Sequence, residues 1–177
     1  ASTVLFPHLN KQKKEIVIKN YEVNVAYVLI FVYVMMLTYY PLTLFIHLFL
    51  SEYNDSLVYF RILFPIVGIT STISLVNFNY FKVFRKGTVY FCISIFILGI
   101  AALSNWIAYL FFRTPIAIAV STLLVTFLWY ILTEFYFVKK YRVKWLKNTL
   151  YMAVSILNFE VTSHVESSFL GAMSYLI

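Results

Sequence analysis

Long apolar segments alternate with short charged segments along most of the chain. The apolar runs cover about 23–50, 56–81, 89–112 and 116–138, with a shorter one at 148–160. About 20 apolar residues suffice for an α-helix to cross the hydrocarbon core of a bilayer. The pattern therefore predicts an all-α, polytopic membrane helix bundle with four to five, and at most six, transmembrane helices.

These elements are predicted to form a single transmembrane helical domain over residues 1–177. The chain begins at Ala1 without an initiator methionine or the pattern of a signal peptide, and it ends inside the apolar run 169–177. We therefore expect a fragment of a longer protein or a processed chain.

Basic residues collect in every second polar segment. The bases lie in Lys11–Lys19, Lys82–Lys86 and Lys139–Lys147, whereas the two opposing loops contain one base, Arg113. Loops rich in Lys and Arg remain in the cytoplasm. We expect the three basic segments to be cytoplasmic and the acidic segment Ser51–Asp55 to lie on the opposite side.

The composition excludes an ordinary soluble domain. Hydrophobic residues make up 62% of the chain and charged residues only 12%, about half the share of soluble domains. Helix-end loops account for the net charge of +7, so nucleic acid is not an expected partner. Cys92 is the only cysteine, so it forms no internal disulfide, and we expect no metal site and no cofactor.

Polar and small residues inside the apolar runs are the candidate functional positions. On a helical wheel for 56–81, Arg61, Gly68, Thr72 and Asn79 share a narrow arc. Lipid cannot satisfy such a stripe, so we expect it to face other helices or water. Arg61 is the strongest candidate for a binding residue because a guanidinium group binds phosphate or carboxylate well. The alternative is that Arg61 lies near enough to the helix end to extend to the interface.

Two later crossings carry similar faces. Asn105 lies near the middle of 89–112 among small residues, and it needs a partner on another helix. Thr122 belongs to a small and polar face of 116–138. Together with the stripe, both residues are predicted to line a substrate cavity. Helix-to-helix hydrogen bonding is the alternative.

Three titratable residues are candidates for coupling transport to H⁺ or Na⁺. Histidine is the side chain type that changes charge near neutral pH, and His47 lies near a helix end, although such a histidine is often only interfacial. Glu160 and His164 are four residues apart, so a helix would place them on one face as a proton-linked pair. The alternative setting for that pair is an exposed loop.

Two expectations concern the membrane interface. Glu134 precedes Lys139 and Lys140 by about one turn, and we expect it to pair with a base there. Aromatic residues with polar tips form belts at membrane interfaces. The expected belt consists of Tyr39, Tyr40, Tyr53, Tyr80, Trp129 and Trp145.

Several short motifs occur in a particular order. They are Thr3-Val4-Leu5-Phe6-Pro7 before a basic loop, Tyr40-Pro41-Leu42, Ser51-Glu52-Tyr53, Asn77-Phe78-Asn79-Tyr80-Phe81-Lys82, Asn105-Trp106-Ile107-Ala108-Tyr109-Leu110 and Ile116-Ala117-Ile118-Ala119-Val120-Ser121-Thr122. This order resembles the C-terminal half of the polysaccharide flippases, which belong to the multidrug, oligosaccharidyl-lipid and polysaccharide exporter superfamily. The resemblance covers roughly residues 1–140.

The resemblance implies a protein that moves undecaprenyl-diphosphate-linked oligosaccharide units, such as those of O-antigen and lipopolysaccharide, across the bacterial inner membrane by alternating access. This chain would supply most of the second of two six-helix lobes. Its partners would be membrane lipid, the lipid-linked oligosaccharide and the missing N-terminal lobe. Two features depart from the family: the chain extends past residue 145, and no dense cationic cluster for a diphosphate is visible.

Two other classes of function remain open. A non-catalytic membrane subunit of a larger complex would pack the same small and polar faces dry against its partners. A membrane enzyme acting on lipid-linked sugars would need a large outer loop, and the loops here are short. The sequence contains no Ser-His-Asp set, paired carboxylates or Gly-rich phosphate loop, so we do not expect an enzyme.

Overall fold

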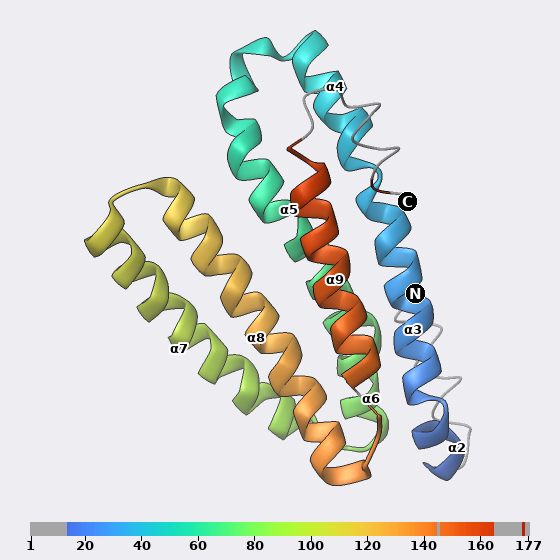
Figure 1. The fold of residues 1–177 in the computed structure, drawn as a ribbon. Helices are drawn as coiled ribbons and strands as arrows, with labels where there is room; N and C mark the ends of the chain where they lie inside the picture. Colours follow the sequence, from blue (N-terminus) through green and yellow to red (C-terminus); the bar gives the residue numbers. More distant parts are fainter. Residues whose placement is uncertain (1–13, 145, 165–174, 176–177) are drawn as a thin grey trace.

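Four long apolar helical segments dominate the fold (Figure 1). The computed structural model describes residues 14–144, 146–164 and 175. Among these residues, the segments long and apolar enough to cross a membrane are Tyr21–Phe49, Ser51–Val83, Gly87–Phe112 and Pro115–Tyr141. No strand occurs in the described part, and the predicted all-α, polytopic helix bundle is confirmed.

The first span is broken near its middle. A short helix, α2 (Lys14–Lys19), precedes α3 (Tyr21–Met36), and α4 (Tyr39–Phe49) continues in the same direction. Pro41 lies in the first turn of α4, where backbone N–H groups have no partner within the helix. The break at Leu37 and Thr38 therefore accommodates the proline without the loss of an internal hydrogen bond.

The second span lies at the centre of the bundle. It consists of the 3₁₀ helix η1 (Ser51–Ser56), α5 (Leu57–Thr72), the π-helix η2 (Ile73–Asn77) and α6 (Phe78–Val83). Helix α5 packs against α3, α4, α8 and α9. The apolar run predicted one helix over 56–81, but it did not predict the π-helix.

The third and fourth spans form a hairpin that leans away from the other helices (Figure 1). Helix α7 (Gly87–Phe112) packs along α8 (Pro115–Tyr141), and only Ile97 and Ala108 of α7 are buried. The small residues of α7 were expected to bring another helix close. At Gly99 no described atom beyond the adjoining turns of α7 lies within 4 Å of where a Cβ would be, so no such contact forms there.

Helix α9 (Leu146–Thr162) lies against α3 and α5. It has 17 residues and extends slightly beyond the predicted 148–160. It is shorter than the four spans, which have 26–33 residues. Its buried face mixes polar and apolar side chains: Asn148, Thr149, Met152, Ser155, Phe159 and Thr162.

Aromatic side chains fill the space between the helices. Of the residues expected in an interfacial belt, Tyr39, Tyr40 and Tyr80 are buried in two core clusters, so that expectation is wrong for them. Their hydroxyl groups explain why burial is tolerated: Tyr80 accepts from Asn24 Nδ2 at 2.7 Å, and Tyr40 bonds Thr162 at 2.8 Å. The expected belt residue at position 145 lies outside the described residues.

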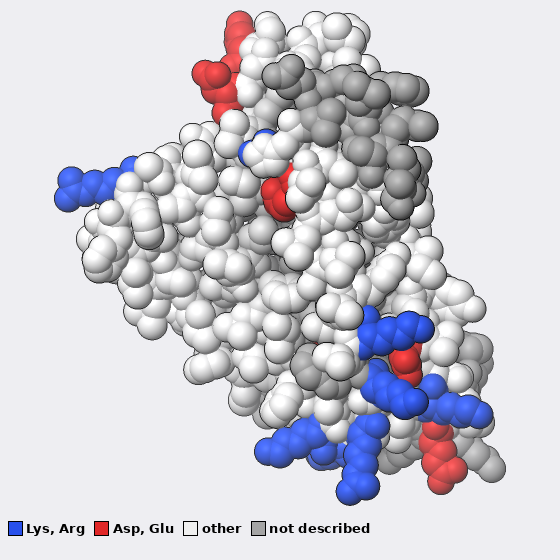
Figure 2. Space-filling view, viewed as in Figure 1, with Lys and Arg blue, Asp and Glu red and all other residues white. Residues whose placement is uncertain are grey.

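Charge separates along the bundle (Figure 2). Most Lys and Arg lie at the end formed by α2, the α6–α7 turn and the end of α8, whereas the acids of η1 lie at the other end. The exposed bases of the first end include Lys82, Arg85, Lys139 and Lys140. The two ends of the bundle therefore differ in charge, in the order that the sequence predicts.

Three helices end beside an arginine with a left-handed backbone. Arg85, Arg113 and Arg142 follow α6, α7 and α8 and have φ of 53°, 50° and 55°. Glycine usually occupies this position because a Cβ is strained there, by roughly 1–2 kcal/mol. An arginine at each of these positions is therefore less favourable for the backbone than a glycine would be.

Candidate functional site

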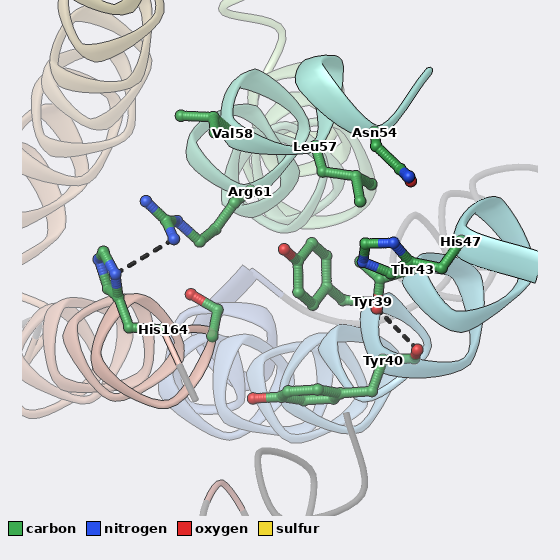
Figure 3. Close-up of a pocket in the computed structure, with 10 residues that line it drawn as sticks. Tyr39, Tyr40, Thr43, His47, Asn54, Leu57, Val58, Arg61 and His164 are labelled. Atoms are coloured by element: carbon green, nitrogen blue, oxygen red, sulfur yellow. Dashed lines mark hydrogen bonds between the residues drawn. The ribbon is translucent and has the colours of Figure 1, made fainter. Parts of the chain in front are cut away.

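A cavity of about 250 Å³ lies between α4, α5 and the end of α9 (Figure 3). We call it the Arg61 cavity. It is lined by Tyr39, Tyr40, Thr43 and His47 from α4, Asn54 from η1, Leu57, Val58 and Arg61 from α5, and Ser163 and His164 after α9. Because separate elements supply its walls, the cavity depends on the tertiary packing. It lies toward the end of the bundle that carries the acids of η1.

The guanidinium group of Arg61 is oriented by His164. Arg61 Nη1 lies 3.2 Å from His164 Nδ1, which accepts the hydrogen bond when the neutral ring carries its proton on Nε2 (Figure 3). Arg61 Nε is buried and has no hydrogen-bond partner in the described chain. A buried donor without a partner calls for a ligand or water, and an arginine donor favours an anion.

The cavity brings together three of the predicted candidates. Arg61 and His164 lie on one side, and His47 lies across from them beyond the ring of Tyr39 (Figure 3). Glu160 is part of α9 and is half-buried, so the exposed loop considered for it is wrong. Helix α9 ends at Thr162, so His164 lies in the turn after the helix that carries Glu160, and its Nδ1 lies 3.2 Å from Arg61 Nη1.

The remaining candidates lie elsewhere. Thr72 and Asn79 are fully buried and donate to backbone carbonyls of their own span, Thr72 to Gly68 at 3.1 Å and Asn79 to Leu75 at 2.8 Å. Both therefore lie outside the Arg61 cavity.

The predicted partner of Asn105 is on α8. Thr122 Oγ1 lies 3.4 Å from Asn105 Oδ1 across the hairpin, and it also lies 2.8 Å from the Ile118 carbonyl of its own helix, which is the better acceptor for its one hydrogen. Thr122 also lines a separate, mostly apolar cavity of about 330 Å³ between these helices. The five substrate candidates thus do not share one cavity in this conformation.

A buried polar cluster around Glu134 was not anticipated from the sequence. The Tyr21 hydroxyl donates to Glu134 Oε1 at 2.7 Å and lies 3.2 Å from Asn77 Oδ1. Asn77 Nδ2 in turn donates to Thr133 Oγ1 at 2.7 Å. These four residues, the Tyr21–Glu134 cluster, connect α3, η2 and α8 by side chains alone.

The expected pairing of Glu134 with a lysine is wrong. Glu134 is 1% exposed, whereas Lys139 and Lys140 point to solvent. No base among the described residues forms an ion pair with it. The helical phase gives the reason: Thr133 and Glu134 lie on the buried face of α8 with Tyr130 and Phe137. The helical phase could therefore have predicted the burial of Glu134 from the sequence.

The described residues contain no group of three His, Cys, Asp or Glu side chains placed to hold a metal ion. Comparison of the chain with protein-family models, with curated proteins and with solved structures finds no match. The function is therefore inferred from the chemistry of the site.

Proposed function

We propose that this chain is the second lobe of a transporter that moves a lipid-linked oligosaccharide across the bacterial inner membrane by alternating access. The observation that supports this most is the Arg61 cavity, in which a partly buried arginine keeps a donor without a partner. A diphosphate linkage carries the oxygen acceptors and the charge that a guanidinium group binds best. Membrane protein character follows from the four apolar spans.

The described residues around Arg61 leave its guanidinium group able to bind an anionic ligand. His164 presents an acceptor to Nη1, so it orients the guanidinium group without neutralising its charge. Glu160 attracts Arg61 from α9, but no ion pair connects them. Glu160 thus offsets part of the charge of Arg61 without occupying its hydrogen-bond donors.

The size of the cavity limits what it holds. About 250 Å³ is slightly below the range of about 300–1,000 Å³ that is usual for ligand pockets. The cavity accommodates a phosphate-sized group, and the sugars would lie outside it, toward the partner lobe. In this proposal the protein binds and releases the lipid without a catalytic step.

The test is the sidedness of lipid-linked oligosaccharide in cells. Deletion of the gene that encodes this chain should leave the oligosaccharide accessible only from the cytoplasmic side, and the wild-type gene should restore it to the outer side. Unchanged translocation in the deletion strain would reject the proposal.

A non-catalytic membrane subunit is the second candidate, and one observation favours it. Gly68, Thr72 and Asn79 are buried inside the bundle, as expected for a face that packs against neighbouring helices. The exposed apolar side of α7 would then bind another protein and not lipid. Purification in a mild detergent distinguishes the two, because a subunit would retain a stoichiometric partner and its loss would not change translocation.

A further inference from the structure

The carboxyl group of Glu134 lies in the interior of a long apolar helix, about two turns before the end of α8. Its titratable neighbours are the phenols of Tyr21 from α3 and of Tyr130 from its own helix, and the Tyr80 phenol of α6 lies behind them, next to Tyr21. From α9, the uncharged side chain of Thr149 lies near the Tyr130 phenol. No titratable group of α5 or α7 lies close enough to Glu134 to affect its charge. All the facing groups are thus neutral or acidic in the described chain.

A carboxyl group buried in a membrane span needs a positive charge from some source. No Lys, Arg or His among the described residues forms an ion pair with Glu134. We propose that Glu134 is a proton-binding site, in which a proton from solution neutralises the carboxyl group and its binding changes how α3 is attached to the bundle. This inference does not depend on the proposed transport substrate.

The geometry of the cluster accommodates both states of the carboxyl group. A tyrosine hydroxyl has one hydrogen and can also accept. When Glu134 is ionised, Tyr21 donates to Oε1 across 2.7 Å. When Glu134 is protonated, it donates to the Tyr21 oxygen across the same distance, and the Tyr21 hydrogen turns to Asn77 Oδ1, 3.2 Å away. No heavy atom has to move.

The same arrangement favours a proton over a metal cation. The position next to Oε1 that a cation would occupy is already filled by the Tyr21 hydroxyl. Asn77 Nδ2 donates to Thr133 Oγ1, and an N–H donor cannot serve as a metal ligand. A cation at Oε1 would therefore compete with the hydrogen bond from Tyr21.

Protonation therefore changes the helix to which Tyr21 donates. In the ionised state α3 donates to α8, and in the protonated state it donates to η2. The π-helix belongs to the span that carries Arg61. π-Helical turns frequently occur at functional sites, and here one places Asn77 within reach of the switch.

Infrared difference spectroscopy of the full-length protein in lipid nanodiscs tests the proposal. A change of pH should produce a C=O stretching band of a protonated carboxyl group. The band should be absent in Glu134→Gln, which keeps the shape and neutrality of the protonated side chain and should therefore fold. It should shift in Tyr21→Phe, which removes the hydrogen-bond partner. Glu15→Gln, an exposed acid of α2, is the matched control and should leave the band unchanged.

Two outcomes would overturn the proposal. One is a band that persists in Glu134→Gln, or a Glu134 carboxylate signal at every pH at which the protein remains folded. The other is a Glu134 signal that responds to Na⁺ at constant pH, which would identify a cation site. Potentiometric titration gives a second measurement, because Glu134→Gln should release fewer protons than the wild type over the same pH interval.

Discussion

Val32 of α3 and Gly68 of α5 are in such close contact that a Cβ on Gly68 would lie 2.5 Å from Val32 Cγ1. The end of the Met36 side chain lies 3.3 Å from the same point. In the second span, Gly68 lies between Arg61 and Asn77. This contact therefore joins α3 and α5 in the part of the second span between the Arg61 cavity and the Tyr21–Glu134 cluster.

The contact predicts opposite behaviour for two glycines. Gly68→Ala should lower the free energy of unfolding by about 1–3 kcal/mol, because the added methyl group overpacks the α3–α5 contact. Gly99→Ala should be neutral or raise it by up to about 1 kcal/mol, since alanine favours the helix and the site is open. Unfolding with denaturing detergent in mixed micelles measures both values. Equal effects at the two positions would contradict the close contact.

Arg61 should control the binding of phosphate-bearing lipid. Arg61→Ala should weaken binding of undecaprenyl diphosphate by about tenfold to a hundredfold, as expected for loss of a charged hydrogen-bond donor. Arg61→Lys should retain part of the affinity, because it keeps the charge but loses the planar fork. Binding to the purified protein in nanodiscs gives the affinities, and undecaprenol, which lacks the phosphates, is the control ligand. Full binding by Arg61→Ala would remove Arg61 from the site.

Arg113 provides a test of backbone strain that is separate from charge. Arg113→Gly should raise the free energy of unfolding by roughly 1 kcal/mol, because glycine adopts the left-handed conformation without strain. Arg113→Ala removes the same charge but keeps a Cβ, so it should show no such gain. If both variants change stability equally, charge and not backbone conformation is responsible.

The charge separation predicts how the chain is oriented in the membrane. In a Cys92→Ser background, single cysteines at Asp55→Cys and Lys86→Cys should react with a membrane-impermeant maleimide from opposite faces of sealed vesicles. The background protein itself should not react and serves as the control. Labelling of both positions from the same face would refute the predicted orientation.

The spans could be predicted because their boundaries are set by local chemistry. The run predicted over 89–112 corresponds to Gly87–Phe112, and 116–138 corresponds to Pro115–Tyr141. Charged residues and a proline delimit both runs, and neither signal depends on what the helix packs against. The π-helix was not predicted because its sequence, Ile73–Asn77, is as apolar as the turns around it.

The candidate site could be predicted only in part. Arg61, His47 and His164 were singled out by their chemistry, but their common cavity depends on the packing of α4, α5 and α9. Arg61 and His164 are 103 positions apart, and no local pattern relates them. For Glu134 the nearby lysines suggested the wrong partner, although its helical phase with Tyr130 indicated burial.

The π-helix also affects how this chain should be aligned with others. A π-turn closes its hydrogen bonds over five residues instead of four and so contains one more residue than an α-turn. A relative with a regular helix here would be one residue shorter between Thr72 and Phe78. An ungapped alignment would then place Tyr80 and Phe81 opposite residues that face a different neighbour, and a conserved core would look like a divergent surface.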